Sequence, residues 1–300
     1  MIKVIQNMDR GILFMLLASI SFAMMGGFAK VVSQELPPVE VTFFRNIFGV
    51  LLVGLAIWKV PLKQTGGKPL LLLFRGFMGF TALLAYFYIM AHIPLGEAVT
   101  YNKTSPIFVA IFAYVFLKEK LHPSALLAII LGFIGIVFVA QPQGGEFDKY
   151  DILGIFSGIG AALAYTSIRE LRKYYDTRAI VMSFMGVGTI APLLLMLSTP
   201  YIEVSQDFDW MFAEFVMPQG VQWGYVTAVG IFATISQLLM TKAYELTKAG
   251  IVGTISYSNI VFAVIIGVML GDPIPDIWTI LGILLVIISG LLVAFPKGNR

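Results

Sequence analysis

The sequence predicts an all-α polytopic membrane protein, with ten transmembrane helices arranged as two inverted five-helix repeats. Three observations support this fold class. The chain is 58% hydrophobic and only 12% charged, about half the charged fraction of a soluble domain, and its mean hydropathy is +0.89. Its apolar residues form blocks long enough to cross a bilayer as helices. The second half of the chain also repeats features of the first. The blocks cover about 11–32, 38–58, 70–91, 95–117, 123–140, 152–170, 179–198, 221–241, 249–270 and 277–295.

The basic residues alternate between the two ends of these blocks. If the N-terminus is cytoplasmic, 16 of the 20 lysines and arginines lie in or beside cytoplasmic segments, as the positive-inside rule requires. The loop at 199–220 holds four acids and no lysine or arginine, which fits the outer face. The first block is too long for a signal-peptide core and lacks a small-x-small cleavage site, so we expect it to be retained. We expect a multi-pass protein of a cell membrane, the inner membrane of a bacterium, with both termini cytoplasmic.

An internal repeat relates the two halves of the chain. A shift of 154 residues places Phe108 on Phe262, with further apolar matches in the same register. The predicted five-helix repeats are residues 1–142 and 150–296. Because five is odd, the second repeat enters the bilayer from the opposite side, which is the arrangement found in transporters that alternate a central site between two faces.

A polar stretch in the fourth block predicts an enclosed cavity. Seven of the nine residues at 97–105 are polar, and at about 100° per residue they cover most of the helix circumference. Charged groups at membrane depth cost at least a few kcal/mol each, so this stretch must be enclosed by helices or water. The 154-residue shift pairs it with 251–259, and we expect two half-cavities that meet near Pro106 and Ile260. The cavity-lining candidates from these stretches are Tyr101, Asn102, Lys103, Thr104, Ser256, Tyr257 and Asn259.

Three positions of the fourth block, and Glu40 of the second, carry specific hypotheses. Lys103, about 12 Å along its helix, is the main candidate for substrate binding, with a buried ion pair or an interface anchor as alternatives. Pro106 removes a backbone hydrogen bond and frees a carbonyl, which serves either helix packing or a site. Glu97 and Glu40 are candidates for proton coupling, although a solvated helix cap is an alternative role for each.

Further candidates lie in other blocks. Arg45 stays charged at any physiological pH, so it needs a carboxylate, helix-end carbonyls or an anionic substrate group, and a structural partner is favoured. Tyr88, Tyr165 and Gln237 are placed near the predicted cavity, with an aromatic interface belt as the alternative for the tyrosines. Lys30, near the end of the first block, is expected to be a snorkelling anchor.

Catalytic signatures are missing from the sequence. There is no H-E-x-x-H, no G-x-x-x-x-G-K-[ST], and the two histidines fall on opposite sides of the predicted topology. The absence of cysteine excludes disulfides and thiolate metal sites. We therefore expect no enzyme, no metal and no cofactor. The expected partners are a small-molecule substrate and the lipid bilayer but no nucleic acid, and a homodimer is left open.

Over roughly residues 11–296, four motifs carry a family resemblance. They are VEVTFFRNIFG (39–49), LLFRGFMGF (72–80), IPLGEAVTYNKTSPIFVAIFAYVFLKEKL (93–121) and the degraded copy SNIVFAVIIGVMLGD (258–272). The sequence resembles the drug/metabolite transporter (DMT) superfamily in its EamA-domain branch. Two positions depart from the family pattern, because Ile260 stands where a proline is usual and Lys103 has no counterpart.

The resemblance implies an integral membrane secondary transporter. It would move a small organic metabolite, amino-acid-like or cofactor-like (S-adenosylmethionine is one example), by alternating access through a central cavity. The resemblance does not fix the substrate, the direction or the coupling ion. The alternative is a non-transporting membrane-embedded sensor or lipid-handling scaffold on the same fold.

Overall fold

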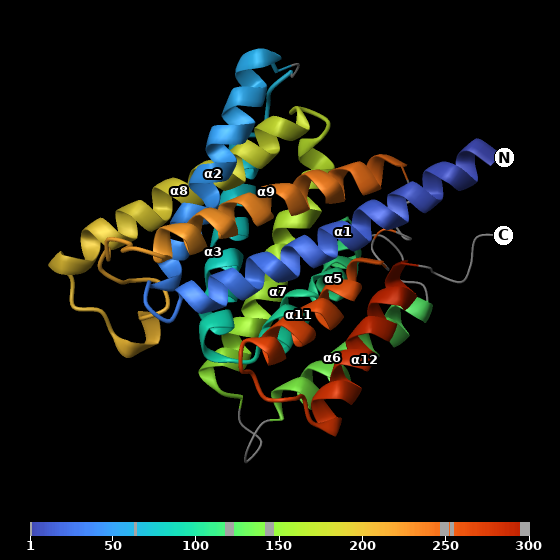
Figure 1. The fold of residues 1–300 in the computed structure, drawn as a ribbon. Helices are drawn as coiled ribbons and strands as arrows, with labels where there is room; N and C mark the ends of the chain where they lie inside the picture. Colours follow the sequence, from blue (N-terminus) through green and yellow to red (C-terminus); the bar gives the residue numbers. More distant parts are fainter. Residues whose placement is uncertain are drawn as a thin grey trace.

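The structure is a computed structural model that describes residues 2–62, 65–117, 123–141, 147–246, 252 and 255–294. The regular secondary structure of these segments is entirely helical, and the helices pack into one bundle (Figure 1). The α-helices are α1 (Ile2–Val32), α2 (Pro38–Lys59), α3 (Pro69–His92), α4 (Leu95–Asn102), α5 (Ser105–Leu117), α6 (Pro123–Ala140), α7 (Lys149–Leu171), α8 (Thr177–Ser198), α9 (Gln222–Leu246), α11 (Ser258–Met269) and α12 (Ile277–Ala294), and the short 3-10 helices are η2 (Thr199–Tyr201) and η3 (Gln206–Phe208).

Most of these helices can cross a membrane. Six of them, α1, α2, α3, α7, α8 and α9, contain spans that are long and apolar enough to do so, and α6, α11 and α12 contain shorter apolar helices. Their outer faces expose large apolar side chains such as Leu51, Leu194 and Leu284. Exposed apolar surface of this extent is covered by lipid in a membrane protein. The predicted all-α polytopic class is confirmed.

Helix starts follow the local sequence. Pro38 and Pro69 are the first residues of α2 and α3, a position where the missing N–H of proline removes no helical hydrogen bond. At α7, Asp148 and Asp151 form a capping box, each carboxylate accepting from the backbone N–H of the other residue. Asp176 caps α8 through the backbone N–H of Arg178. These caps fix where the chain enters each span.

The helices pair in a two-fold pattern. α1 packs against α9 and α3 against α7, while α2 packs against α8 and α6 against α12. When the first five spans are exchanged with the second five, the α1–α9 pair becomes the α7–α3 pair. The α2–α8 and α6–α12 pairs each map onto themselves. Figure 1 shows α1 and α9 side by side across the bundle, with α6 and α12 together at its edge. The two five-span repeats are therefore visible in the packing, and their predicted residue bounds stay a prediction.

The contact between α6 and α12 shows how the repeats are related. A Cβ atom on Gly282 would lie 2.7 Å from the carbonyl oxygen of Gly135, so the two backbones touch without room for a methyl group. A second contact joins the same helices, where the Ser289 hydroxyl donates to the Ala128 carbonyl at 2.7 Å. The 154-residue shift converts the first residue pair into the second. The two helices therefore exchange places under the repeat.

The fourth predicted span is two helices instead of one. α4 and α5 are separated by a turn at Lys103, and Pro106 lies in the first turn of α5, where it has no N–H to continue the helix. The ninth span also breaks, at Tyr257, which is the residue that the 154-residue shift pairs with Lys103. Ile260 stands at the place of Pro106, so this second break has no proline. Thr254, in the same predicted polar stretch, lies outside the described residues.

The two ends of the bundle differ. α1 begins and α12 ends at one end, which we call the terminal end. The opposite end carries the 199–221 loop and is called the long-loop end.

Candidate functional site

Two arginines from different helices converge on one aromatic ring inside the bundle. The guanidinium carbons of Arg45 in α2 and Arg75 in α3 lie 5.3 and 5.0 Å from the ring centroid of Phe184 in α8. The two residues are only 4% and 7% exposed. Each lies roughly 10 Å along its helix from the nearer helix end, at 1.5 Å per residue. We call Arg45 and Arg75 the arginine pair.

The hydrogen bonds around the arginine pair leave both guanidinium groups incompletely satisfied. Arg45 Nη1 donates to Asn46 Oδ1 at 2.8 Å, and Asn46 Nδ2 donates to the Thr42 and Gly188 carbonyls at 2.8 and 3.1 Å. The Nε atoms of both arginines are buried without a hydrogen-bond partner. Within the described residues, neither arginine has an ion pair. Among the described residues, the structural partner favoured for Arg45 from the sequence is the side-chain amide of Asn46 instead of a carboxylate.

Glycines allow this close packing. A Cβ on Gly79 would collide with the Arg75 guanidinium and lie 2.8 Å from the Phe184 ring. A Cβ on Gly188 would lie 2.6 Å from the Asn46 amide nitrogen. A methyl group at either position would make the Arg75 guanidinium, the Phe184 ring or the Asn46 amide shift.

Tyr165 of α7 connects the arginine pair with an exposed region. It lies near both arginines and Tyr86, yet it is 51% exposed. Tyr165 lies seven residues after Gly158, which contacts Thr104 at the α4–α5 turn. Residues seven apart lie on the same face of a helix. Tyr165 is therefore on the side of α7 that faces the broken span.

The α4–α5 break holds the predicted polar residues of the fourth span. Lys103 and Asn102 are half-buried, and Lys103 makes no hydrogen bond or ion pair within the described part of the chain. The Thr104 hydroxyl donates to the Tyr101 carbonyl at 2.6 Å. The Tyr101 phenol donates to Asp151 of α7. Tyr101 and Thr104 are thus engaged in the bundle interior, and Lys103 is the charged group at the break.

The second break gathers the candidates of the other repeat. Asn259 is 5% exposed, and its Oδ1 atom has no hydrogen-bond partner. Tyr257 is buried against α12, where a Cβ on Gly290 would collide with its phenol. Ser256 and Gln237 are half-buried. The break therefore contains a buried amide with unused acceptor capacity.

An ion pair joins the two repeats at the long-loop end. Lys30 of α1 pairs with Asp272, which follows α11, and both side chains are only 13% and 12% exposed. Lys30 also donates to the Ile93 carbonyl at 2.9 Å. The second Asp272 oxygen accepts from the backbone N–H of Leu95, the first residue of α4, at 2.7 Å. Asp272 therefore caps a helix of the other repeat. Lys30 is an ion-pair partner, and the snorkelling role expected from the sequence is wrong.

Tyr88 lies in a second cluster at the long-loop end. Its phenol donates to Asp209 in the 199–221 loop at 3.0 Å. Lys149 pairs with the same carboxylate and lies 5.3 Å from the centroid of the Tyr88 ring. The His92 and Tyr150 rings stack beside it, with centroids 5.1 Å apart. These contacts fasten the long loop to α3 and α7.

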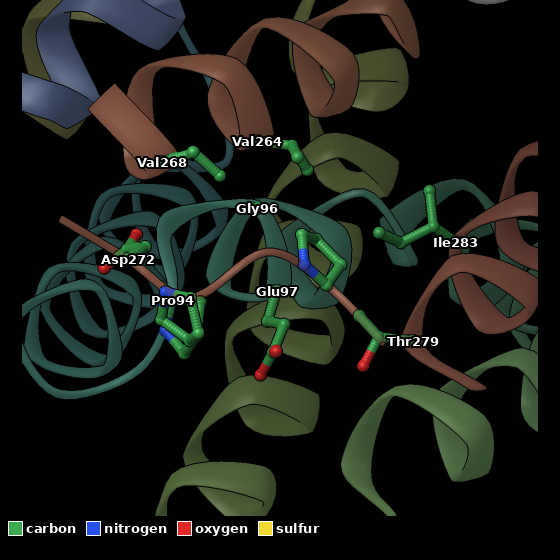
Figure 2. A pocket seen from close by; sticks show the side chains of 10 residues that line it. Pro94, Gly96, Glu97, Val264, Val268, Asp272, Thr279 and Ile283 are labelled. Atoms are coloured by element: carbon green, nitrogen blue, oxygen red, sulfur yellow. The ribbon is translucent and has the colours of Figure 1, made fainter. Parts of the chain in front are cut away.

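The two carboxylates proposed for proton coupling are both at the long-loop end. Glu40 is fully buried. One of its oxygens accepts from the Val216 N–H at 2.9 Å, and the other has no partner. Glu97 lines a pocket between the two repeats. Figure 2 shows its carboxylate pointing away from Val264 and Val268, which line the opposite wall. Their part in proton coupling stays a prediction.

Comparison with known proteins agrees with this geometry. The model of the EamA-like transporter family matches the chain twice, over residues 9–141 and 148–295. The chain belongs to the EamA-like transporter family. Among relatives of this EamA-like protein, an uncharacterized transporter of Helicobacter pylori strain J99 is 32% identical over 293 residues, or 95% of each chain. The pseudopaline exporter CntI of Pseudomonas aeruginosa strain UCBPP-PA14 is 30% identical over 98% of this chain and 99% of its own.

A solved crystal structure supports the EamA-like fold. It has a TM-score of 0.58, is 17% identical, and covers 92% of this chain and 95% of its own. This likeness bears on the fold alone. The family and the names of the relatives identify a multi-pass membrane transporter.

The EamA-like chain holds three residues whose roles the sequence analysis misses. The positive-inside count treats Arg75 as a flanking residue, although it lies six residues inside an apolar helix, and that depth is the signal for its burial. Asp272 ends the degraded copy of the family motif, but nothing in the sequence pairs it with Lys30. Phe184 is one apolar residue within an apolar span, and only the packing of α8 distinguishes it.

Proposed function

We propose that this EamA-like protein is a secondary transporter that moves a small organic metabolite, amino-acid-like or cofactor-like, by alternating access through a central cavity. The observation that carries the proposal is the pair of helix breaks at Lys103 and Tyr257, at equivalent positions of the two repeats. Broken spans leave backbone groups unpaired in the middle of a membrane protein. Secondary transporters build their substrate sites from such discontinuous helices.

Two further features support access from one end at a time. The Lys30–Asp272 pair joins the two repeats at the long-loop end, and in the proposal it closes that end. The exposed Tyr165 lies on the face of α7 that is turned toward the broken span. In this arrangement a solute reaches the interior from the terminal end, and the ion pair must break before the solute can leave at the other.

We further propose that the terminal end faces the cytoplasm of a bacterium and that the protein lies in the inner membrane. The distribution of basic residues supports this orientation. Lys68, Lys173 and Arg178 all lie at the terminal end, where they pair with acids. The relative CntI is named as an exporter, which supports movement from the terminal end to the long-loop end.

Reconstitution tests the proposed transport. Liposomes containing the purified full chain should show saturable, protein-dependent flux of at least one labelled metabolite, with and without a proton gradient. The chain has no cysteine, so a matched control is available in which Lys30→Cys and Asp272→Cys are joined by a short bis-maleimide. We expect the cross-link to abolish flux and the two unlinked substitutions to retain it. Absence of flux for every solute and gradient would favour a sensor or scaffold.

A further inference from the structure

We infer that the arginine pair binds the two carboxylates of a small organic dianion. The inference names the substrate class of the transport site proposed above, and it rests on that proposed function. Four observations carry it: the uncompensated charge, the free edge of each guanidinium group, the separation of the two groups and the exposed tyrosine beside them.

The first observation is the uncompensated charge. Two other partly buried basic groups of the described chain have an acid partner, since Lys30 pairs with Asp272 and Arg178 with Asp176, while Lys103 at the α4–α5 break has none there. The arginine pair has none among the described residues, and the two guanidinium groups act on each other as like charges. The Phe184 ring and the Asn46 amide supply partial charges only. Buried like charges in a low-dielectric interior repel strongly, so a doubly charged anion is the ligand that compensates both.

The second observation is the edge that each guanidinium group leaves free. The hydrogen bond from Arg45 to Asn46 uses Nη1, while Nε is buried and unpaired. Nε of Arg75 is also buried and unpaired. The Nε side of a guanidinium group binds carboxylates through two parallel N–H···O bonds. Each arginine therefore retains donors that suit one carboxylate.

The third observation is the spacing. Both guanidinium carbons lie within 5.3 Å of one ring centroid, so they are at most about 10 Å apart, a distance that cation–ring contacts of this kind impose. A four- or five-carbon dicarboxylate can contact both. A zwitterionic amino acid would bring one carboxylate and one ammonium group to a site that already carries two positive charges. The geometry therefore favours a dianion over a zwitterion.

The fourth observation is the route. Tyr165 lies near both arginines and is 51% exposed, on the side of α7 that faces the α4–α5 break. Its phenol and the Phe184 ring can flank the carbon chain of a ligand that enters from the terminal end.

Binding measurements on the purified full chain in nanodiscs test the inference. In chloride buffer, succinate should raise the melting temperature and give a saturable calorimetric signal, whereas the neutral isostere succinamide should give neither. Arg45→Gln and Arg75→Gln should each weaken succinate binding by about tenfold to a hundredfold, since hydrogen bonds to charged groups contribute that much. Lys59→Gln, which removes a positive charge from the exposed end of α2, should leave the affinity unchanged. Arg75→Lys should lose less affinity for succinate than Arg75→Gln, because lysine keeps the positive charge although it lacks the paired N–H donors of the guanidinium group.

Other results would overturn the inference. Equal effects of succinate and succinamide, or unchanged affinity in both glutamine variants, would mean that the arginine pair is not an anion site. If the variants do not fold, phenylglyoxal modification of the wild-type chain replaces them, with the modified arginines identified by mass spectrometry. Succinate should protect Arg45 and Arg75 but not Arg178, and a lack of protection counts against the site.

The inference and the proposed transport can fail separately. If succinate binds through the arginine pair but no solute crosses the liposome membrane, the anion site stands and the transport function fails. If neutral or cationic solutes are transported at rates that Arg45→Gln and Arg75→Gln leave unchanged, transport stands and the anion site is refuted.

Discussion

Replacing Asp272 with asparagine should open the long-loop end of the protein. The carboxylate of Asp272 pairs with Lys30 and accepts a hydrogen bond from the backbone N–H of Leu95. Asparagine retains an oxygen for the Leu95 N–H but removes the charge. Lys30 is then left mostly buried with the Ile93 carbonyl as its remaining partner. The closed arrangement loses stability, while an open arrangement in which Lys30 reaches water does not.

The size of the effect follows from burial. Removing one partner of a fully buried ion pair costs about 3–5 kcal/mol. The two side chains here are 13% and 12% exposed, and the hydrogen bond to Leu95 survives, so we take about 2 kcal/mol for the closed state. At 1.4 kcal/mol per factor of ten, the ratio of closed to open molecules should fall about 30-fold.

Cysteine accessibility measures this ratio. Thr100 is 1% exposed and lies about 8 Å along α4 from its first residue, beneath the Lys30–Asp272 pair. A Thr100→Cys substitution introduces the single thiol of the chain, since the natural sequence has none. An impermeant maleimide added at the long-loop side should label this thiol about 30 times faster when Asp272→Asn is also present. Asp207→Asn, an exposed acid in the 199–221 loop, is the matched control and should leave the rate unchanged.

An unchanged labelling rate in a folded Asp272→Asn protein would refute the reasoning. It would show that apolar packing closes the long-loop end and that the ion pair adds nothing to the closed state. A charge exchange, Lys30→Asp with Asp272→Lys, provides the complementary test. It should restore slow labelling if attraction between the two side chains holds the end shut.

Three further predictions address other parts of the molecule. Lys103→Ala should reduce flux while changing the free energy of unfolding by less than about 1 kcal/mol, because the substitution leaves no partner of Lys103 unpaired among the described residues. Equal loss of flux and of melting temperature would mean a structural role. Gly79→Ala should lower the free energy of unfolding by about 1–3 kcal/mol, because the new Cβ collides with the Arg75 guanidinium. Gly186 faces open space, so Gly186→Ala should leave the melting temperature unchanged or raise it slightly. At the terminal end, hydrogen bonds from Lys173 and Lys68 lower the pKa of Glu170 from 4.5 to about 2. The stabilisation by Glu170 is therefore complete above about pH 4.5 and lost as the pH falls toward 2, and the difference in melting temperature between wild type and Glu170→Gln should shrink over that range, with a constant difference contradicting it.

The spans and the first helix break could be predicted from the sequence because their signals are local. An apolar block of sufficient length becomes a helix in a membrane, and Pro106 interrupts the fourth block through its own missing N–H. The break at Tyr257 has no such signal, since no proline lies near it and the nearest glycine, Gly253, is four residues away. Packing of Tyr257 against Gly290 belongs to that break, and this contact joins residues more than thirty positions apart.

The arginine pair marks the limit of sequence reasoning at the candidate site. The depth of Arg45 in its span indicates a buried cation, but its convergence with Arg75 on Phe184 depends on how α2, α3 and α8 are rotated about their axes. That rotation is set by close approaches at Gly79 and Gly188, whose partners no local pattern identifies. The same holds for Lys30 and Asp272, which are 242 positions apart in the chain.

The contact of Gly135 with Gly282 has a mechanical consequence. Two backbones that touch over a glycine cannot slide along each other without meeting a neighbouring side chain, so α6 and α12 form a stiff post at the edge of the bundle. One helix of the post ends the first repeat and the other ends the second. Any rocking of one repeat against the other must therefore pivot on this post. A bulkier residue at either glycine would block the movement before it changed the chemistry of the interior.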